Sequence, residues 1–137
     1  MLHMTGMTAL LLFTVWTLLL MFTYVGYRVI LVFAGKKKAD AWTRGAQTDD
    51  PGFVVRASHA HLNCVENLPI FAAIVLAAYA LNKSAVVDQV AIYYLAARVL
   101  QSLVHLSGVS HWRVFVRGNL FIIQGLLCFY MVWGLLA

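Results

Sequence analysis

Charged residues are scarce in this sequence. They make up 11% of its 137 residues, against 63% hydrophobic residues, whereas a soluble domain carries roughly 25% charged and about 45–50% apolar residues. A chain with so little polar surface cannot cover a globule in water. Its length suffices for one domain and no more. The composition therefore excludes an ordinary soluble protein and predicts a single domain, residues 1–137, embedded in a lipid bilayer.

Cysteines and acidic residues are also few. Cys64 and Cys128, the two cysteines, lie in apolar runs and form no CxxC or metal-type cluster, so neither a disulfide scaffold nor a metal site is predicted. Five acidic residues against ten basic ones give a net charge of +5. The basic residues gather in connecting segments without interleaved aromatic residues. We interpret them as topology-setting charges beside a membrane and expect no nucleic-acid partner.

Four apolar runs approach or exceed the roughly 20 residues that a helix needs to cross a bilayer. They cover approximately residues 9–34, 57–81, 85–106 and 114–137. The first is much longer than the roughly 7–15-residue apolar core of a signal peptide, and no basic residue precedes it. We interpret it as a retained span. The sequence thus predicts an all-α fold, an integral membrane four-helix bundle.

The basic residues in the connections predict the orientation of the chain. Residues 35–56 contain five Lys or Arg, and Arg113 and Arg117 flank the third connection, whereas the second connection has only Lys83. By the positive-inside rule, the first and third connections face the cytoplasm and both termini face away from it. The very short termini, without an apparent organelle-retention signal, favour a multi-pass protein of a bacterial inner membrane.

Polar side chains follow two of the predicted spans at helical spacing. A charge in mid-bilayer costs at least about 2.5–3.5 kcal/mol, so such residues face the protein interior and mark function or pairing. Steps of three and four residues place them on one stripe of each helix. The residues on the two stripes are Arg56, His59, Asn63, Glu66, Arg98, Gln101 and His105.

Two interpretations of these stripes are open. The polar residues could form a network that only fixes helix packing, with Glu66 and Arg98 as its natural opposite charges. Alternatively they could bind a polar, charged ligand, since carboxylates need Arg and His donors and an amino group needs an acid such as Glu66. Their number exceeds what packing requires and favours a ligand.

The start of the second span carries a recognisable motif. It comprises Arg56, Ala60-His61, Asn63, Glu66-Asn67, Pro69 and Phe71. This pattern resembles the signature of the MAPEG superfamily (membrane-associated proteins in eicosanoid and glutathione metabolism). Ala-Ala-Arg98 in the third span and Arg113 at the start of the fourth are supporting matches.

The resemblance implies a homotrimer that binds glutathione as a cosubstrate between subunits at the cytoplasmic side, without a metal. It further implies that Arg113 stabilises the thiolate, with Arg117 as the alternative because of a short gap. The residues implied in glutathione binding or in the polar interior around it are Arg56, His59, Asn63, Glu66, Arg98, Gln101 and His105.

Three positions depart from the pattern of the eicosanoid enzymes. His59 stands where many of them have a second Arg, and Gln101 and His105 stand where they have His and Tyr. Without the Tyr hydroxyl, prostaglandin or leukotriene synthesis is disfavoured. The branch that fits better is the bacterial or microsomal glutathione transferase-like one.

The leading functional hypothesis is a glutathione-dependent transferase or peroxidase. A buried arginine beside the sulfur would lower the pKa of the thiol, and the thiolate would attack a lipophilic electrophile or hydroperoxide in the membrane. The alternative is a non-catalytic membrane module that binds a lipid or thiol and partners with another protein. A small transporter is disfavoured because the sequence has no internal repeat and no broken helix of the usual kind.

Overall fold

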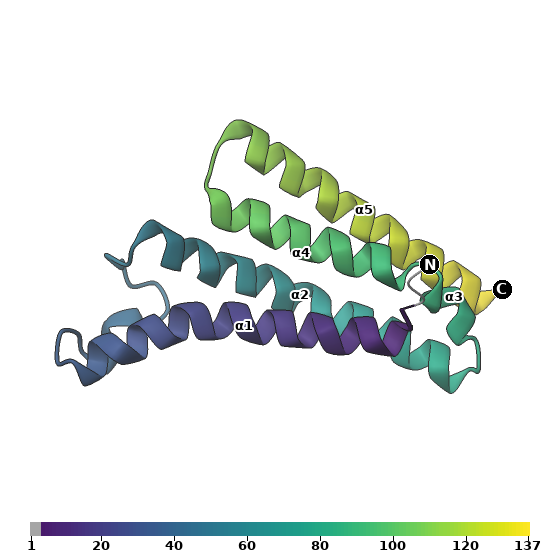
Figure 1. The fold of residues 1–137 in the computed structure, drawn as a ribbon, viewed down its shortest axis with the longest axis horizontal. Coiled ribbons are helices and arrows are strands. Elements are labelled where there is room, and N and C mark those ends of the chain that lie inside the picture. Colours follow the sequence, from purple (N-terminus) through teal and green to yellow (C-terminus); the bar gives the residue numbers. More distant parts are fainter. Residues whose placement is uncertain (1–3) are drawn as a thin grey trace.

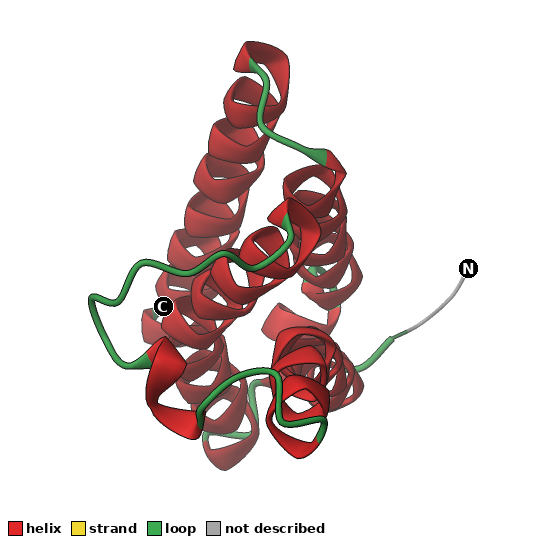
Figure 2. Cartoon of the chain, turned by 90° about the vertical axis from the view of Figure 1, so that its left-hand side faces the viewer, coloured by secondary structure: helices red, strands yellow, loops and turns green. Residues whose placement is uncertain are grey.

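The computed structural model describes residues 4–137, and all regular structure in that range is helical (Figure 2). The elements are α1 (Gly6–Phe33), the 3₁₀ turn η1 (Ala39–Trp42), α2 (Gly52–Ala80), α3 (Ser84–Asp88), α4 (Ala91–Ser107) and α5 (His111–Leu136). Four long helices lie side by side (Figure 1). The start of α1, the end of α5 and α3 share one end of the molecule, and the long loop after α1 and the α4–α5 turn share the other.

Local chemistry explains where the helices begin. The hydroxyl of Thr5 accepts a hydrogen bond from the backbone N–H of Thr8 and caps α1, and the hydroxyl of Ser110 caps α5 in the same way. Helix α2 begins at Gly52, five residues before the predicted start, and the carbonyl of Pro51 accepts the first helical hydrogen bond, from the N–H of Val55 at 3.1 Å.

The predicted third span, residues 85–106, is divided into α3 and α4. The carboxylate of Asp88 accepts hydrogen bonds from the backbone N–H of Gly6 at 2.6 Å and from the Tyr79 hydroxyl at 3.4 Å. These bonds tie the end of α3 to the start of α1 and the end of α2. Because Asp88 is held by other parts of the chain, the helix turns at Gln89–Val90 before α4 starts.

The core joins three helices through aromatic side chains. Phe71 of α2 stacks on Tyr94 of α4 with ring centroids 4.1 Å apart. Phe13 of α1 lies 6.2 Å from Phe71 and 6.1 Å from Tyr94. All three rings are buried. The arrangement fixes α1, α2 and α4 relative to one another, and α5 packs mainly on α4.

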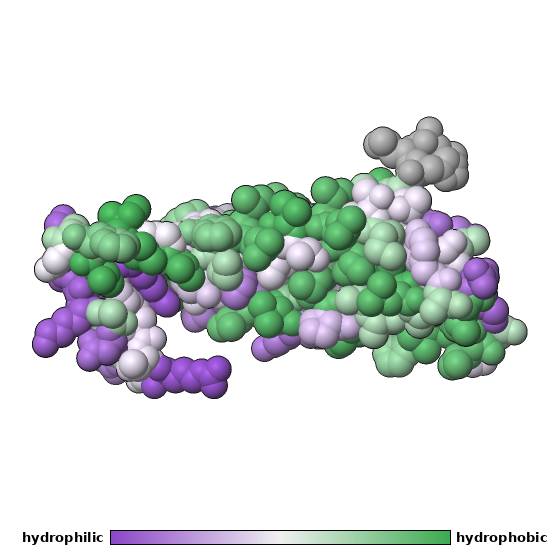
Figure 3. All heavy atoms as spheres, turned by 90° about the horizontal axis from the view of Figure 1, so that it is seen from below, coloured by the Kyte–Doolittle hydropathy of each residue, from purple (hydrophilic) through white to green (hydrophobic). Residues whose placement is uncertain are grey.

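The outer surface is apolar along most of its length. Large hydrophobic side chains are exposed on every long helix, and hydrophilic ones gather at the ends (Figure 3). Three helices, α1, α2 and α5, are long and apolar enough to cross a membrane. Helix α4 has 17 residues, about 26 Å at roughly 1.5 Å per residue. The chain is therefore an all-helical membrane protein with three candidate spans.

Close packing of α3 on α5 predicts the effect of enlarging Gly134. A Cβ there would lie 2.6 Å from Cγ1 of Val86, a stiff β-branched side chain. We expect Gly134→Ala to lower the free energy of unfolding by about 1–2 kcal/mol, since overpacking is destabilising. Gly118→Ala, also in α5, meets no atom within 4 Å and should raise it by about 0.5–1 kcal/mol through helix propensity.

The two alanine variants are compared by unfolding in detergent micelles, followed by circular dichroism. Equal stability of the two would contradict the contact between α3 and α5.

Candidate anion-binding site

Arg98 of α4 is the centre of the polar interior. Its side chain is almost fully buried, with 1% exposure. Nη1 donates to Oε1 of Gln101 at 2.8 Å and to the backbone carbonyl of Asn63 at 3.3 Å. Nε and Nη2 have no hydrogen-bond partner within residues 4–137. Arg98 is thus a buried cation with two donor nitrogens that no group in residues 4–137 satisfies.

A pair of glutamines holds one side of Arg98. Nε2 of Gln124, on α5, donates to the Gln101 Oε1 that also accepts from Arg98, at 3.2 Å. Nε2 of Gln101 donates to the backbone carbonyl of Arg117 at 3.2 Å. Gln124 is fully buried, and its Oε1 has no partner in the described part of the chain. Sequence reasoning missed Gln124, although an amide seven residues after Arg117 in an apolar run was a usable signal.

The two predicted stripes face each other towards the loop end. Nδ2 of Asn63 lies 3.3 Å from Nδ1 of the buried His105. The His59 ring lies 6.2 Å from the His105 ring. Nε of Arg56 donates to the carbonyl of Leu106 at 2.9 Å. Six of the seven predicted residues, all except Glu66, therefore surround one region between α2 and α4.

Glu66 does not pair with Arg98, contrary to the packing interpretation. Its side chain is exposed on the outer side of α2, and the Asn63 carbonyl, on the inner side, takes the hydrogen bond from Arg98 instead. In residues 4–137 the ion pairs are Arg28–Asp50 and Lys37–Asp49, both near the long loop. The positive charge of Arg98 is therefore not balanced by an acid of the same chain.

The two candidate arginines of α5 occupy different places. Arg113 is exposed, and its Nη1 would lie 3.0 Å from a Cβ on Gly108, so the side chain folds onto the α4–α5 turn. Arg117 is partly buried, its carbonyl bonds to Gln101, and its charge lies within electrostatic range of His105. The role of either arginine stays a prediction, and the geometry favours Arg117.

An apolar groove opens beside this region, between α2 and α5. It has a volume of about 320 Å³ and is lined by Asn67, Ile70, Ile74, Phe121, Gly125, Cys128, Phe129 and Val132. Nδ2 of Asn67 donates to the Asn63 carbonyl at 2.9 Å, the same oxygen that accepts from Arg98. The Asn63 carbonyl therefore links Asn67, which lines the groove, to the buried Arg98.

The arrangement is a buried and unbalanced positive charge in a mostly apolar membrane protein. Within residues 4–137, no three His, Cys, Asp or Glu side chains are grouped so as to hold a metal ion. No curated protein and no solved structure gives a significant match to the chain. The model of the MAPEG family matches residues 6–137, nearly the whole sequence and every residue of the site. The chain belongs to the MAPEG family.

Proposed function

We propose that this protein binds glutathione and uses its thiolate on a lipophilic electrophile or hydroperoxide in the membrane, as a glutathione transferase or peroxidase of the bacterial or microsomal type. One observation carries the proposal: Arg98 is a buried cation with two unpartnered nitrogens and no acid of its own chain to balance it. A buried, unpaired charge is costly. An anionic ligand removes that cost.

The chemistry of glutathione suits the residues present. Its two carboxylates match the guanidinium groups of Arg98 and Arg56, which lie on facing helices. Its amino group needs an acid, and Glu66 is exposed on the outer side of α2, so in the proposed trimer it would come from a second copy. Asn63 and His105 offer further hydrogen bonds between these charges. No metal is required.

Thiolate formation is the chemical task of the site. A thiol with a pKa of about 8.5 is only a few per cent ionised at neutral pH. A guanidinium beside the sulfur favours the thiolate, and a downward shift of two pKa units corresponds to about 2.7 kcal/mol. The thiol proton leaves to water at the loop end. The sulfur then forms a bond to the electrophile, whose leaving group departs with the bonding electron pair.

The groove between α2 and α5 is suited to the lipophilic substrate. Its wall is apolar apart from Asn67, and several of its lining side chains, such as Ile70, Phe121 and Phe129, are exposed on the outer surface. A substrate dissolved in the bilayer can enter it without crossing water. The reactive end of the substrate would then lie near Asn67. The Asn63 carbonyl accepts hydrogen bonds from both Asn67 and Arg98.

The same proposal includes a four-span subunit that assembles as a homotrimer in a bacterial inner membrane. Helices α3 and α4 together cover residues 84–107, long enough to complete a fourth crossing of roughly 30 Å. The start of α1 and the end of α5 lie at the end opposite the long loop (Figure 1), so a cytoplasmic loop puts both of them on the far side. A trimer would bring Glu66, exposed in the single subunit, against a second copy.

The first test is an ultraviolet difference spectrum of the detergent-purified protein during titration with glutathione. We expect a saturable thiolate absorption at neutral pH, because free glutathione is mostly thiol under the same conditions. S-methylglutathione, which has no ionisable thiol, is the control ligand and should bind without the band. Absence of the band in protein shown to be folded contradicts the enzyme proposal.

A non-catalytic binding module is the second candidate. Gln101 stands in place of a histidine. Its amide oxygen accepts hydrogen bonds from Arg98 and Gln124, and its amide nitrogen donates to the Arg117 carbonyl. It is therefore not free to act on a substrate. Saturable glutathione binding without a thiolate band would favour this candidate over the enzyme.

A further inference from the structure

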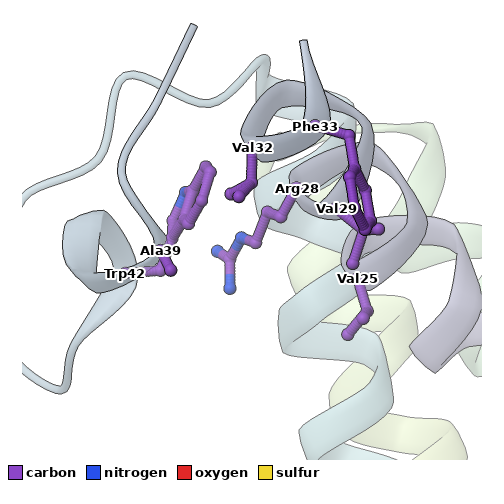
Figure 4. A pocket seen from close by; sticks show the side chains of 7 residues that line it. All are labelled: Val25, Arg28, Val29, Val32, Phe33, Ala39 and Trp42. Carbon is purple, nitrogen blue, oxygen red and sulfur yellow. The ribbon is translucent and has the colours of Figure 1, made fainter. Parts of the chain in front are cut away.

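A second crevice lies at the loop end, and it shares no residue with the Arg98 region. It has a volume of about 260 Å³ between the last turns of α1 and η1. Its lining residues are Val25, Arg28, Val29, Val32, Phe33, Ala39 and Trp42 (Figure 4). The walls are apolar except for the Arg28 guanidinium, which extends into the space between α1 and the Trp42 ring.

The crevice is held open by a network around Arg28. Nε and Nη2 of Arg28 donate to Oδ2 of the buried Asp50 at 3.1 and 2.9 Å. The Trp42 indole N–H donates to the same carboxylate at 3.0 Å. The guanidinium carbon lies 5.1 Å from the Tyr24 ring centroid and 5.4 Å from that of Trp42. Nη1 makes no hydrogen bond within residues 4–137 and remains available to a ligand.

The crevice continues an apolar stripe that faces lipid. Exposed side chains recur along α1 at steps of three, four and seven residues, at Leu11, Val15, Leu18, Phe22, Val29 and Phe33. These positions share one face of the helix. Val29 and Phe33 also line the crevice. A hydrocarbon chain lying along α1 would therefore reach the crevice without leaving an apolar surface.

Unpaired positive charges lie beside the opening. The segment 34–38 joins two crevice walls, Phe33 and Ala39, and carries Lys36, Lys37 and Lys38. Lys37 donates to Asp49 and lowers the pKa of that carboxyl below its ordinary value. Lys36 and Lys38 form no ion pair in the described chain and outnumber the one unpaired acid nearby, Asp40. The opening thus has a net positive charge.

We infer that this crevice is a binding site for one anionic phospholipid. An acyl chain lies along the α1 stripe and enters the apolar crevice, and the phosphodiester accepts from Nη1 of Arg28 with Lys36 and Lys38 beside it. A phospholipid fits both features, an apolar cleft open to the bilayer and a cation cluster at its end. The site is independent of glutathione and of the groove between α2 and α5.

Native mass spectrometry of the detergent-purified protein tests the site. The protein is mixed with equal amounts of phosphatidylglycerol and phosphatidylcholine of the same chains, and retained lipid is counted. We expect phosphatidylglycerol to be retained about 10- to 30-fold better, since each lysine near an anionic lipid contributes roughly fivefold. The double variant K36Q/K38Q should lose the preference. R44Q, which removes an exposed charge from the same loop but does not line the crevice, should keep it.

A variant of the apolar wall tests the acyl-chain half of the inference. Ala39→Leu narrows the crevice at an exposed position of η1 and should reduce retention of both lipids. Equal retention of the two lipids by the unchanged protein would overturn the inference. So would an equal loss in R44Q and K36Q/K38Q, which would indicate a diffuse charge effect, or full retention in Ala39→Leu.

Discussion

Replacing Arg98 with leucine is expected to leave the ligand-free protein as stable as before, or more stable by up to about 3 kcal/mol, while strongly weakening glutathione binding. The buried guanidinium has two nitrogens without partners and no acid to balance it. The desolvation cost of a buried ion amounts to several kcal/mol, and apolar replacements of buried charges are often neutral or stabilising. Leucine removes that cost and adds apolar contact with Phe13, which the guanidinium now overlies.

The affinity for glutathione, unlike the stability, should fall in the Arg98→Leu variant. Truncating one partner of a buried, hydrogen-bonded charge pair costs about 2–5 kcal/mol, which weakens the glutathione Kd by roughly 30-fold to several thousand-fold. The measurement is thermal unfolding in detergent with and without saturating glutathione. Glutathione should raise the Tm of the unchanged protein, because it binds only the folded state, and should raise the Tm of Arg98→Leu much less at the same concentration.

Arg28→Leu is the matched control. Arg28 is a second arginine at the end of a span, but it is paired with the buried Asp50. Removing it leaves the buried carboxylate of Asp50 without its cation and should destabilise the ligand-free protein by about 3 kcal/mol. If Arg98→Leu instead destabilises the protein as much as Arg28→Leu, then Arg98 already has an anionic partner, such as Glu66 of a second copy, and the ligand proposal for Arg98 fails.

The sequence predicted the helices and the two polar stripes, because both depend on local periodicity. It did not predict the break after Asp88, since that carboxylate bonds to the backbone of Gly6, 82 residues away in the sequence. An apolar run gives no sign of such a distant contact. The division of the third predicted span is therefore a tertiary effect.

The outward direction of Glu66 also lay beyond the sequence pattern. Helix α2 buries its small residues Ala57, Ala60 and Cys64, which allow close approach of neighbouring helices. At about 100° per residue, Glu66 is roughly 200° around the helix from Cys64, so it points away when that face packs inward. Asn63 lies at the edge of the packed face and reaches Arg98 and His105. The sequence predicted the polar stripe, but the buried small residues determine which side of α2 faces the interior.

Replacing Arg117 with alanine is expected to remove most of the glutathione thiolate, whereas Arg113→Ala should retain it. Arg117 is partly buried next to Gln101 and within range of His105. A charge in such a place acts more strongly on a nearby sulfur than one in water. If Arg117 lowers the thiol pKa by two units, its loss reduces the thiolate at neutral pH about 20-fold. The thiolate difference spectrum measures this directly, and turnover with a lipophilic electrophile should fall by about 10- to 30-fold.

Arg113 is the matched control because it has the same charge, on the same helix, one turn earlier. Its side chain is exposed and lies against Gly108, so its removal should leave both the thiolate band and the glutathione Kd within about twofold of the unchanged protein, as for a typical surface change. The reverse outcome, a band lost in Arg113→Ala and kept in Arg117→Ala, would contradict this assignment. It would mean that Arg113, whose guanidinium lies beside Gly108 in this structure, moves to the thiolate when glutathione binds. In that case Gly108→Ala, which crowds the resting position of the guanidinium, should change the thiolate band as well.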